Sequence, residues 1–75
     1  MNNARRKRIA EMITKIDECY SEVESIHDEE DEAFGNMPEG LQQSERGQES
    51  EEARDNLASA RDSLDEAKAY LEDIG

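Results

Sequence analysis

Two rows of apolar residues with heptad spacing contain most of the large apolar side chains of this 75-residue chain. Steps of three and four residues alternate along each row, which keeps the side chains on one face of an α-helix. A strict seven-residue repeat of this kind is typical of a coiled-coil seam. The first row contains Ile9, Met12, Ile16, Cys19, Val23, Ile26 and Ala33, and the second contains Ala53, Leu57, Ala60, Leu64, Ala67, Leu71 and Ile74. The pattern predicts two long helices whose apolar rows face each other.

The segment between the two rows, GNMPEG at residues 35–40, is incompatible with a continuous helix because it contains a proline and two glycines. The sequence therefore predicts an all-α fold, an antiparallel two-helix hairpin that resembles a coiled coil. A single domain would span residues 1–75, with the first helix at about 4–34, a connector at 35–44 and the second helix at about 45–73.

Capping residues occur near the expected helix ends. Asn2 or Asn3 can cap the first helix, Gly35 suits the position just beyond its end, and Ser44 can cap the second helix. Gly47 falls in the first turns of the second helix, where glycine costs about 1 kcal/mol relative to alanine. We expect those turns to be the weakest part of the fold.

The short connector also sets the register of the two helices. Residue numbers of facing positions should add to about 80, which pairs Ile9 with Leu71, Ile16 with Leu64 and Val23 with Leu57. The intervening layers would be Met12 with Ala67, Cys19 with Ala60 and Ile26 with Ala53. Alanines at these positions would allow the helices to approach closely.

A further stripe on the first helix lies one residue beyond the predicted seam and consists of Ile13, Tyr20, His27 and Phe34. The hairpin as predicted does not need it, and an exposed apolar strip usually marks an interface. We expect these four residues to form the interface of a homodimer with two-fold symmetry, an antiparallel four-helix bundle. The alternative is that the strip docks a different protein.

The charge of the chain is strongly acidic and unevenly distributed. The net charge is −12, with 21 acidic and nine basic residues. Such a body repels nucleic acids and anionic membranes, so neither is expected as a direct partner. A basic cluster of residues 5–8 should neutralise the acidic end of the second helix, including the terminal carboxylate, and the negative pole of its dipole.

Catalytic and metal-binding patterns are not found in the sequence. The chain has a single cysteine, Cys19, which excludes a disulfide framework. We expect Cys19 to lie in the seam as a small apolar residue. Glu24 and His27 have the E-x-x-H spacing of di-iron bundles, but Glu24 falls on the outward face. With one His, one Cys and no phosphate loop, we expect no enzyme, no metal and no cofactor. No apolar run has transmembrane length and no secretory signal is visible, so the sequence predicts a cytoplasmic protein.

Acidic residues crowd the predicted hairpin end, although carboxylates at the end of the first helix oppose its dipole. They form either a solvated face or a surface that copies the charge spacing of a phosphate backbone and occupies a basic, nucleic-acid-binding surface of a partner. The residues of this predicted partner-binding tip are Asp28, Glu29, Asp31, Glu32, Glu45, Glu49 and Glu52.

A small polar group is predicted beside this tip. Glu30 takes a seam position opposite Ser50, and a half-buried carboxylate needs a cationic partner, for which Arg46 is placed. We expect an ion pair that fixes the register. Alternatively His27, Glu30, Ser44 and Arg46 form a pocket for an anion such as a nucleotide phosphate.

One segment carries a resemblance to known sequences. Residues 34–47, FGNMPEGLQQSERG, followed by DNL at 55–57 and SLDEA at 63–67, resemble small acidic proteins of phages and prophages of Gram-positive bacteria. These uncharacterised proteins share an "NMPE-LQ-SERG" connector between two glutamate-rich helices. The resemblance implies a phage origin and, by analogy with other small acidic phage proteins, inhibition of a host defence protein.

The functional expectation is a non-enzymatic inhibitor in the host cytoplasm whose acidic tip blocks a basic surface of a host defence protein. One alternative is a sponge that sequesters a small nucleotide signal near Arg46 and His27. Another is a purely structural or scaffolding dimer.

Overall fold

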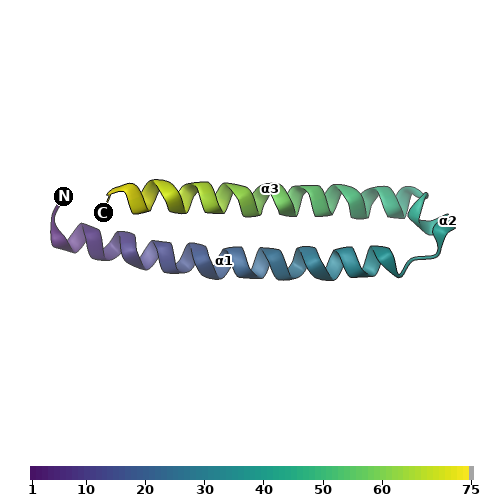
Figure 1. The fold of residues 1–75 in the computed structure, drawn as a ribbon, viewed down its shortest axis with the longest axis horizontal. Coiled ribbons are helices and arrows are strands. Elements are labelled where there is room, and N and C mark those ends of the chain that lie inside the picture. The colour runs from purple at the N-terminus through teal and green to yellow at the C-terminus, as the bar shows by residue number, and fades with distance from the viewer. Residues whose placement is uncertain (75) are drawn as a thin grey trace.

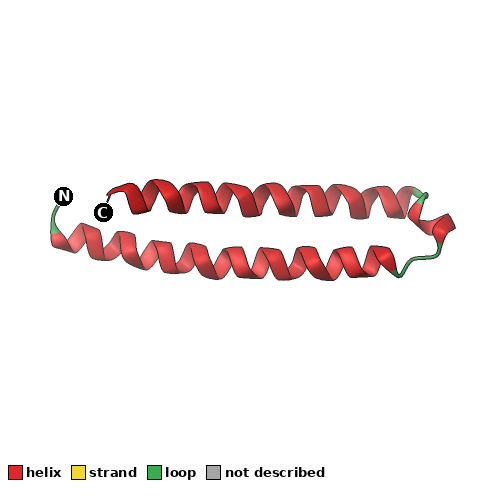
Figure 2. Ribbon diagram, in the orientation of Figure 1, coloured by secondary structure: helices red, strands yellow, loops and turns green. Residues whose placement is uncertain are grey.

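The computed structural model describes residues 1–74 and contains three helices. Helix α1 spans Asn3–Gly35, helix α2 spans Glu39–Gln42 and helix α3 spans Glu45–Ile74. The two long helices run side by side in opposite directions, with α2 at one end of the molecule and both termini at the other (Figure 1). No strand occurs in the described part of the chain (Figure 2). The prediction of an all-helical chain is confirmed, and the molecule is a rod of 58 × 14 × 12 Å.

Helix α1 begins as predicted and ends differently. The Asn2 side chain accepts a hydrogen bond from the Arg5 backbone N–H at 2.8 Å and caps the helix. Gly35 keeps a helical conformation, since no described glycine has a positive φ. The expected glycine cap is therefore wrong. The helix ends at Gly35 and its C-cap is Asn36, whose N–H donates to the Glu32 carbonyl at 3.0 Å, two residues before Pro38.

The connector contains the one-turn helix α2, which the Gln42 side chain attaches to the end of α1. Its Nε2 donates to the carbonyl oxygens of Phe34 at 3.0 Å and Met37 at 3.2 Å. The Phe34 carbonyl, in the last turn of α1, also accepts the Met37 N–H at 3.1 Å. The Ser44 hydroxyl donates to the Leu41 carbonyl, whereas we had expected its oxygen to accept a bond as the cap of α3.

Gly47 is one of two buried residues among those described, and it lies directly against α2. A Cβ atom at this position would lie 2.5 Å from the carbonyl carbon of Gln42 and 2.8 Å from its Cα, and nearer still to its carbonyl oxygen. The absence of a side chain therefore lets the connector fold back onto the first turns of α3. The expectation that this glycine only weakens the helix is corrected by this close approach.

We call the face of each long helix that lies against the other the seam. In every second layer, its residues are not the ones predicted. On α1 the half-buried seam residues are Ile9, Ile13, Ile16, Tyr20, Val23, His27, Glu30 and Phe34. On α3 the seam contains the fully buried Gly47 and Ser50. Its half-buried residues are Arg54, Leu57, Arg61, Leu64, Lys68 and Leu71. The isoleucines, the valine and the leucines of the predicted layers lie in the seam. Their predicted pairing is wrong, because the interhelical ion pairs Asp17–Lys68 and Asp31–Arg54 join residues whose numbers add to 85, not to about 80.

The remaining members of the predicted rows lie outside the seam. Met12, Cys19, Ile26 and Ala33 on α1 are exposed, as are Ala60, Ala67 and Ile74 on α3, whereas Ala53 is half-buried at the edge of the seam. The stripe of Ile13, Tyr20, His27 and Phe34, predicted to face a second copy, is instead packed within the chain. The physical reason is that long basic side chains fill these layers on α3, because their aliphatic stems cover apolar neighbours while the charged ends reach water.

The seam leaves the helical pair with very little interior. No apolar side chain among residues 1–74 is fully buried. Met12 and Ile26 remain 44% and 43% exposed. No helix in the described range has the length and apolar character needed to cross a membrane.

Candidate interaction surfaces

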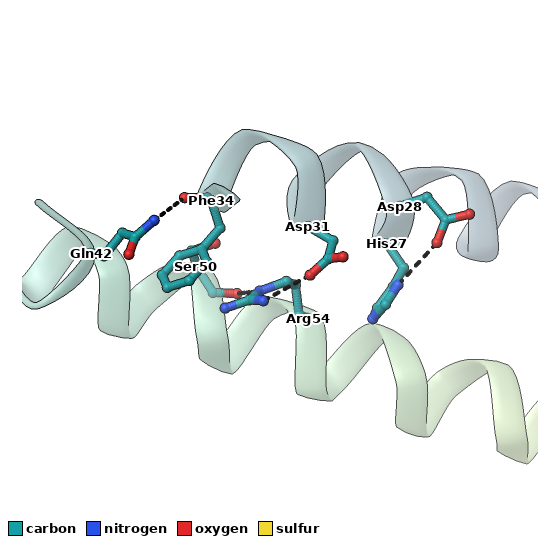
Figure 3. Close-up of polar contacts among 7 residues, drawn as sticks. All are labelled: His27, Asp28, Asp31, Phe34, Gln42, Ser50 and Arg54. Carbon is teal, nitrogen blue, oxygen red and sulfur yellow. Dashed lines mark hydrogen bonds and ion pairs between the residues drawn. The ribbon is translucent and has the colours of Figure 1, made fainter. Parts of the chain in front are cut away.

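Arg54 is the most fully engaged charged residue at the contact between the long helices. Its Nη1 lies 2.9 Å from Asp31 Oδ1, and its Nε donates to the Ser50 carbonyl at 3.4 Å. The guanidinium also lies 4.1 Å from the centre of the Phe34 ring, within cation–π range (Figure 3). With an 18% exposed side chain, Arg54 joins α3 to the last turns of α1.

Arg54 belongs to a row of basic seam residues with heptad spacing, which continues with Arg61 and Lys68. Lys68 Nζ lies 2.8 Å from Asp17 Oδ1 on α1, whereas Arg61 Nε lies 3.6 Å from Asp62 on its own helix. The two interhelical pairs are 14 residues apart on both helices, so they report the same antiparallel register.

These pairs were not predicted from the sequence, although the sequence contains a spacing that indicates them. Asp17, Glu24 and Asp31 are spaced by seven on the first helix, as are the three basic residues on the second. The apolar spacing of the second helix favours Ala53, Ala60 and Ala67, each one residue before a basic residue, and so does not place the basic row in the seam.

Lys68 shows which residues share one side of the helical pair. The Asp17 carboxylate, which accepts its hydrogen bond, raises the pKa of Lys68 above 10.5, and the charges of Glu72 and Asp65 raise it further. These three acids come from both helices, and each follows a seam residue directly. We call this side, which contains Asp17, Glu24, Asp31, Asp65 and Glu72, the charged flank.

The predicted anion pocket is not assembled as proposed. His27 and Glu30 are half-buried in the seam, and His27 Nδ1 lies 3.4 Å from Asp28 Oδ1 (Figure 3). Arg46, however, is exposed and makes no ion pair within residues 1–74. The guanidinium that reaches α1 belongs instead to Arg54, eight residues further along the chain, and it binds Asp31.

Ser50 is the most buried polar residue, with 3% of its surface exposed. Its hydroxyl oxygen has no hydrogen-bond partner, which is uncommon for a buried polar atom. The small side chain leaves room for Phe34 and the stem of Arg54, which lie around it in Figure 3.

The predicted acidic tip is presented to solvent. All seven of its carboxylate residues are exposed. Asp31 is bound to Arg54 and Asp28 lies near His27. The other five, Glu29, Glu32, Glu45, Glu49 and Glu52, form no ion pair with any residue in the described range. The tip therefore combines a high density of carboxylates with few compensating cations.

The basic cluster at the other end of the molecule is also unpaired in the described range. Arg5, Arg6, Lys7 and Arg8 are exposed and form no ion pair with any carboxylate among residues 1–74. The terminal carboxylate expected to meet them belongs to Gly75, outside the described residues. Within the same range, no group of three or more His, Cys, Asp or Glu side chains is arranged to hold a metal ion.

Comparison with known proteins gives no further assignment: no protein-family model, curated protein or solved structure matches this chain. The resemblance of the connector to phage proteins therefore stays a prediction.

Proposed function

We propose that this chain is a non-enzymatic interaction protein, a helical hairpin whose acidic tip binds a basic, nucleic-acid-binding surface of a partner protein. The observation that carries the proposal is the exposure of all seven tip carboxylates, five of them without an ion pair in the described range. A dense array of unpaired carboxylates attracts a basic surface and raises the rate of association with it.

The position of the tip also favours a cationic partner. Residues 28–32 are acidic without interruption and lie in the last turns of α1, where the helix dipole disfavours negative charge. Cations from a partner would relieve both the mutual repulsion of these groups and the unfavourable dipole. By the resemblance of the connector to phage sequences, host defence proteins of Gram-positive bacteria are the first partners to examine.

The proposal is tested with two variants of equal net charge. In the tip variant Glu29, Glu32, Glu49 and Glu52 are changed to Gln. In the control variant Glu11, Glu18, Glu66 and Glu72, which are exposed and lie toward the other end of the rod, are changed to Gln.

Proteins captured from a Gram-positive lysate on the immobilised wild-type chain are then titrated with each variant, with duplex DNA as competitor. We expect the tip variant to lose binding at physiological salt, the control variant to retain it, and DNA to compete with the wild-type chain. Equal binding by the two variants would contradict the proposal, since net charge and not the tip would then govern association.

The second candidate function is a structural dimer that forms a four-helix bundle. It is favoured by the absence of any fully buried apolar side chain among residues 1–74, because a helical pair of this size gains little stability from its own core. The nucleotide sponge receives less support, since Arg46 is exposed and binds none of the other residues proposed for that pocket.

A further inference from the structure

The side of the helical pair opposite the charged flank is apolar. Met12, Cys19, Ile26 and Ala33 on α1 each lie one residue before a member of the seam row Ile13, Tyr20, His27 and Phe34. Ala53, Ala60 and Ala67 on α3 each lie one residue before Arg54, Arg61 or Lys68. The charged-flank residues instead directly follow the other seam residues, which are Ile16, Val23 and Glu30 on α1 and Leu64 and Leu71 on α3.

In an antiparallel coiled coil, equivalent flanking positions of the two helices lie on the same side. The charged flank agrees with this, because Asp17 and Asp31 of α1 lie 2.8 and 2.9 Å from Lys68 and Arg54 of α3. The apolar residues of both helices therefore share the other side, which we call the apolar flank and which Ile74 extends.

We propose that a second copy of this chain covers the apolar flank, related by a two-fold axis perpendicular to the long axis of the rod. The terminal end of one copy then lies against the acidic tip of the other. This inference rests on the dimer in the proposed function and does not require the tip to bind a host protein. It also replaces the dimer interface predicted from the sequence, whose residues are in the seam.

Burial is the first argument for a second copy. The separate chain leaves Met12 and Ile26 more than two-fifths exposed and buries no apolar side chain fully within residues 1–74. A face-to-face pair would enclose the apolar flanks of both copies as a common core, at a gain of about 25 cal/mol for each Å² of apolar surface. The alanines of α3 would allow the two α3 helices to approach closely.

Charge is the second argument, and it selects both the partner and the orientation. Arg8, Lys15, Glu22 and Glu29 form a row of exposed residues, spaced by seven, along the outer edge of the apolar flank on α1. None of them has an ion pair in the described range. The row is basic in its first half and acidic in its second, so it is complementary to itself after a reversal of direction.

The perpendicular axis brings α1 of one copy antiparallel to α1 of the other. Arg8 then lies opposite Glu29 of the second copy, and Lys15 lies opposite Glu22, with each contact made twice by symmetry. An axis parallel to the rod would instead place the two acidic tips together, where like charges repel. Five tip residues, Asp28, Asp31, Glu32, Glu45 and Glu52, would still face away from the apolar flank.

Solution mass and a matched pair of variants test the assembly. We expect the wild-type chain to have the mass of a dimer by sedimentation equilibrium, and Ile26→Glu to weaken association about a hundredfold, because symmetry buries two unpaired charges. The control is Ser25→Glu, at an exposed neighbouring position that points away from the flank. A monomeric wild-type chain, or equal dimer affinity in both variants, would overturn the proposal.

A charge exchange tests the orientation and does not depend on the folding of the Ile26 variant. Lys15→Glu and Glu22→Lys should each weaken the dimer about tenfold, and the double variant should restore it. Zero-length carbodiimide coupling of a mixture of ¹⁴N- and ¹⁵N-labelled chains should join Lys15 of one copy to Glu22 of the other.

Additive effects of the two exchanges, or cross-links that join the two tips, would overturn the proposed orientation. Because these readouts do not involve a host protein, a dimer that binds no basic partner would count against the acidic-tip function alone.

Discussion

Replacement of Gly47 by alanine should destabilise the protein, although alanine is the better helix former. Gly47 is the third residue of α3, and helix propensity alone predicts that alanine there would raise the free energy of unfolding by about 1 kcal/mol. The structure predicts the opposite sign. The added Cβ would meet three backbone atoms of Gln42, two of them at 2.5 and 2.8 Å, and backbone cannot rotate away as a flexible side chain can.

The magnitude follows from what must move. To admit the methyl group, α2 has to shift from α3, which costs about 1–3 kcal/mol as overpacking. The shift also removes the Gln42 side chain from the carbonyl oxygens of Phe34 and Met37, two hydrogen bonds worth about 1 kcal/mol each. After subtraction of the propensity gain of about 1 kcal/mol, we expect a net destabilisation of about 2–4 kcal/mol.

Urea denaturation followed by circular dichroism at 222 nm would measure this change. The matched control is Gly35→Ala, since Gly35 is also helical and its added Cβ would have no neighbour within 4 Å. That variant should be stabilised by about 0.5 kcal/mol. In a double-mutant cycle, Gly47→Ala and Gln42→Ala should not be additive, because both release the same contact. Equal stabilisation by the two glycine replacements would refute the reasoning.

Three other changes have outcomes that the structure determines. Ser50→Ala should stabilise the fold by about 1 kcal/mol, because it removes a buried hydroxyl that has no hydrogen-bond partner. The gain would be measured as a higher urea midpoint, and a loss of stability would mean that the hydroxyl has a partner. Arg54→Lys should cost about 1 kcal/mol through loss of the guanidinium on the one phenylalanine ring, whereas Arg61→Lys, without a ring contact in the described structure, should change little. Asp17→Asn should lower stability at neutral pH by removing the acceptor of Lys68. Since the folded-state pKa of Lys68 is raised above 10.5, its contribution is complete below 10.5 and is lost as pH rises through the raised value, so the two unfolding curves should converge there. A difference that persists in strong alkali would contradict this account.

Part of the fold could be read from the sequence because it depends on local chemistry. The helical content follows from the seven-residue periodicity, and the break between the long helices follows from Pro38 and the neighbouring glycines. The Asn2 cap was among the expected features, since an asparagine oxygen beside free N–H groups needs no tertiary contact to bind them.

The choice between two adjacent rows of α1 could not be made from periodicity. Both rows share Ile9, Ile16 and Val23, and both repeat every seven residues. The second helix offered alanines at one set of positions and Arg54, Arg61 and Lys68 at the other. Polarity favoured the alanines, but the long stems of the basic residues fill the space between helices and their charges reach Asp17 and Asp31.

The sequence by itself determined the elements: two long helices, a break between them, a strongly acidic composition and a concentration of carboxylates near the break. Only the tertiary structure decided which side chains lie between the helices, that Gly47 is a point of close approach, and which apolar residues remain outside. The reason is physical. Hydrogen bonding and periodicity act within a helix, whereas the rotation of one helix against another depends on how side chains of unequal length share the space between them.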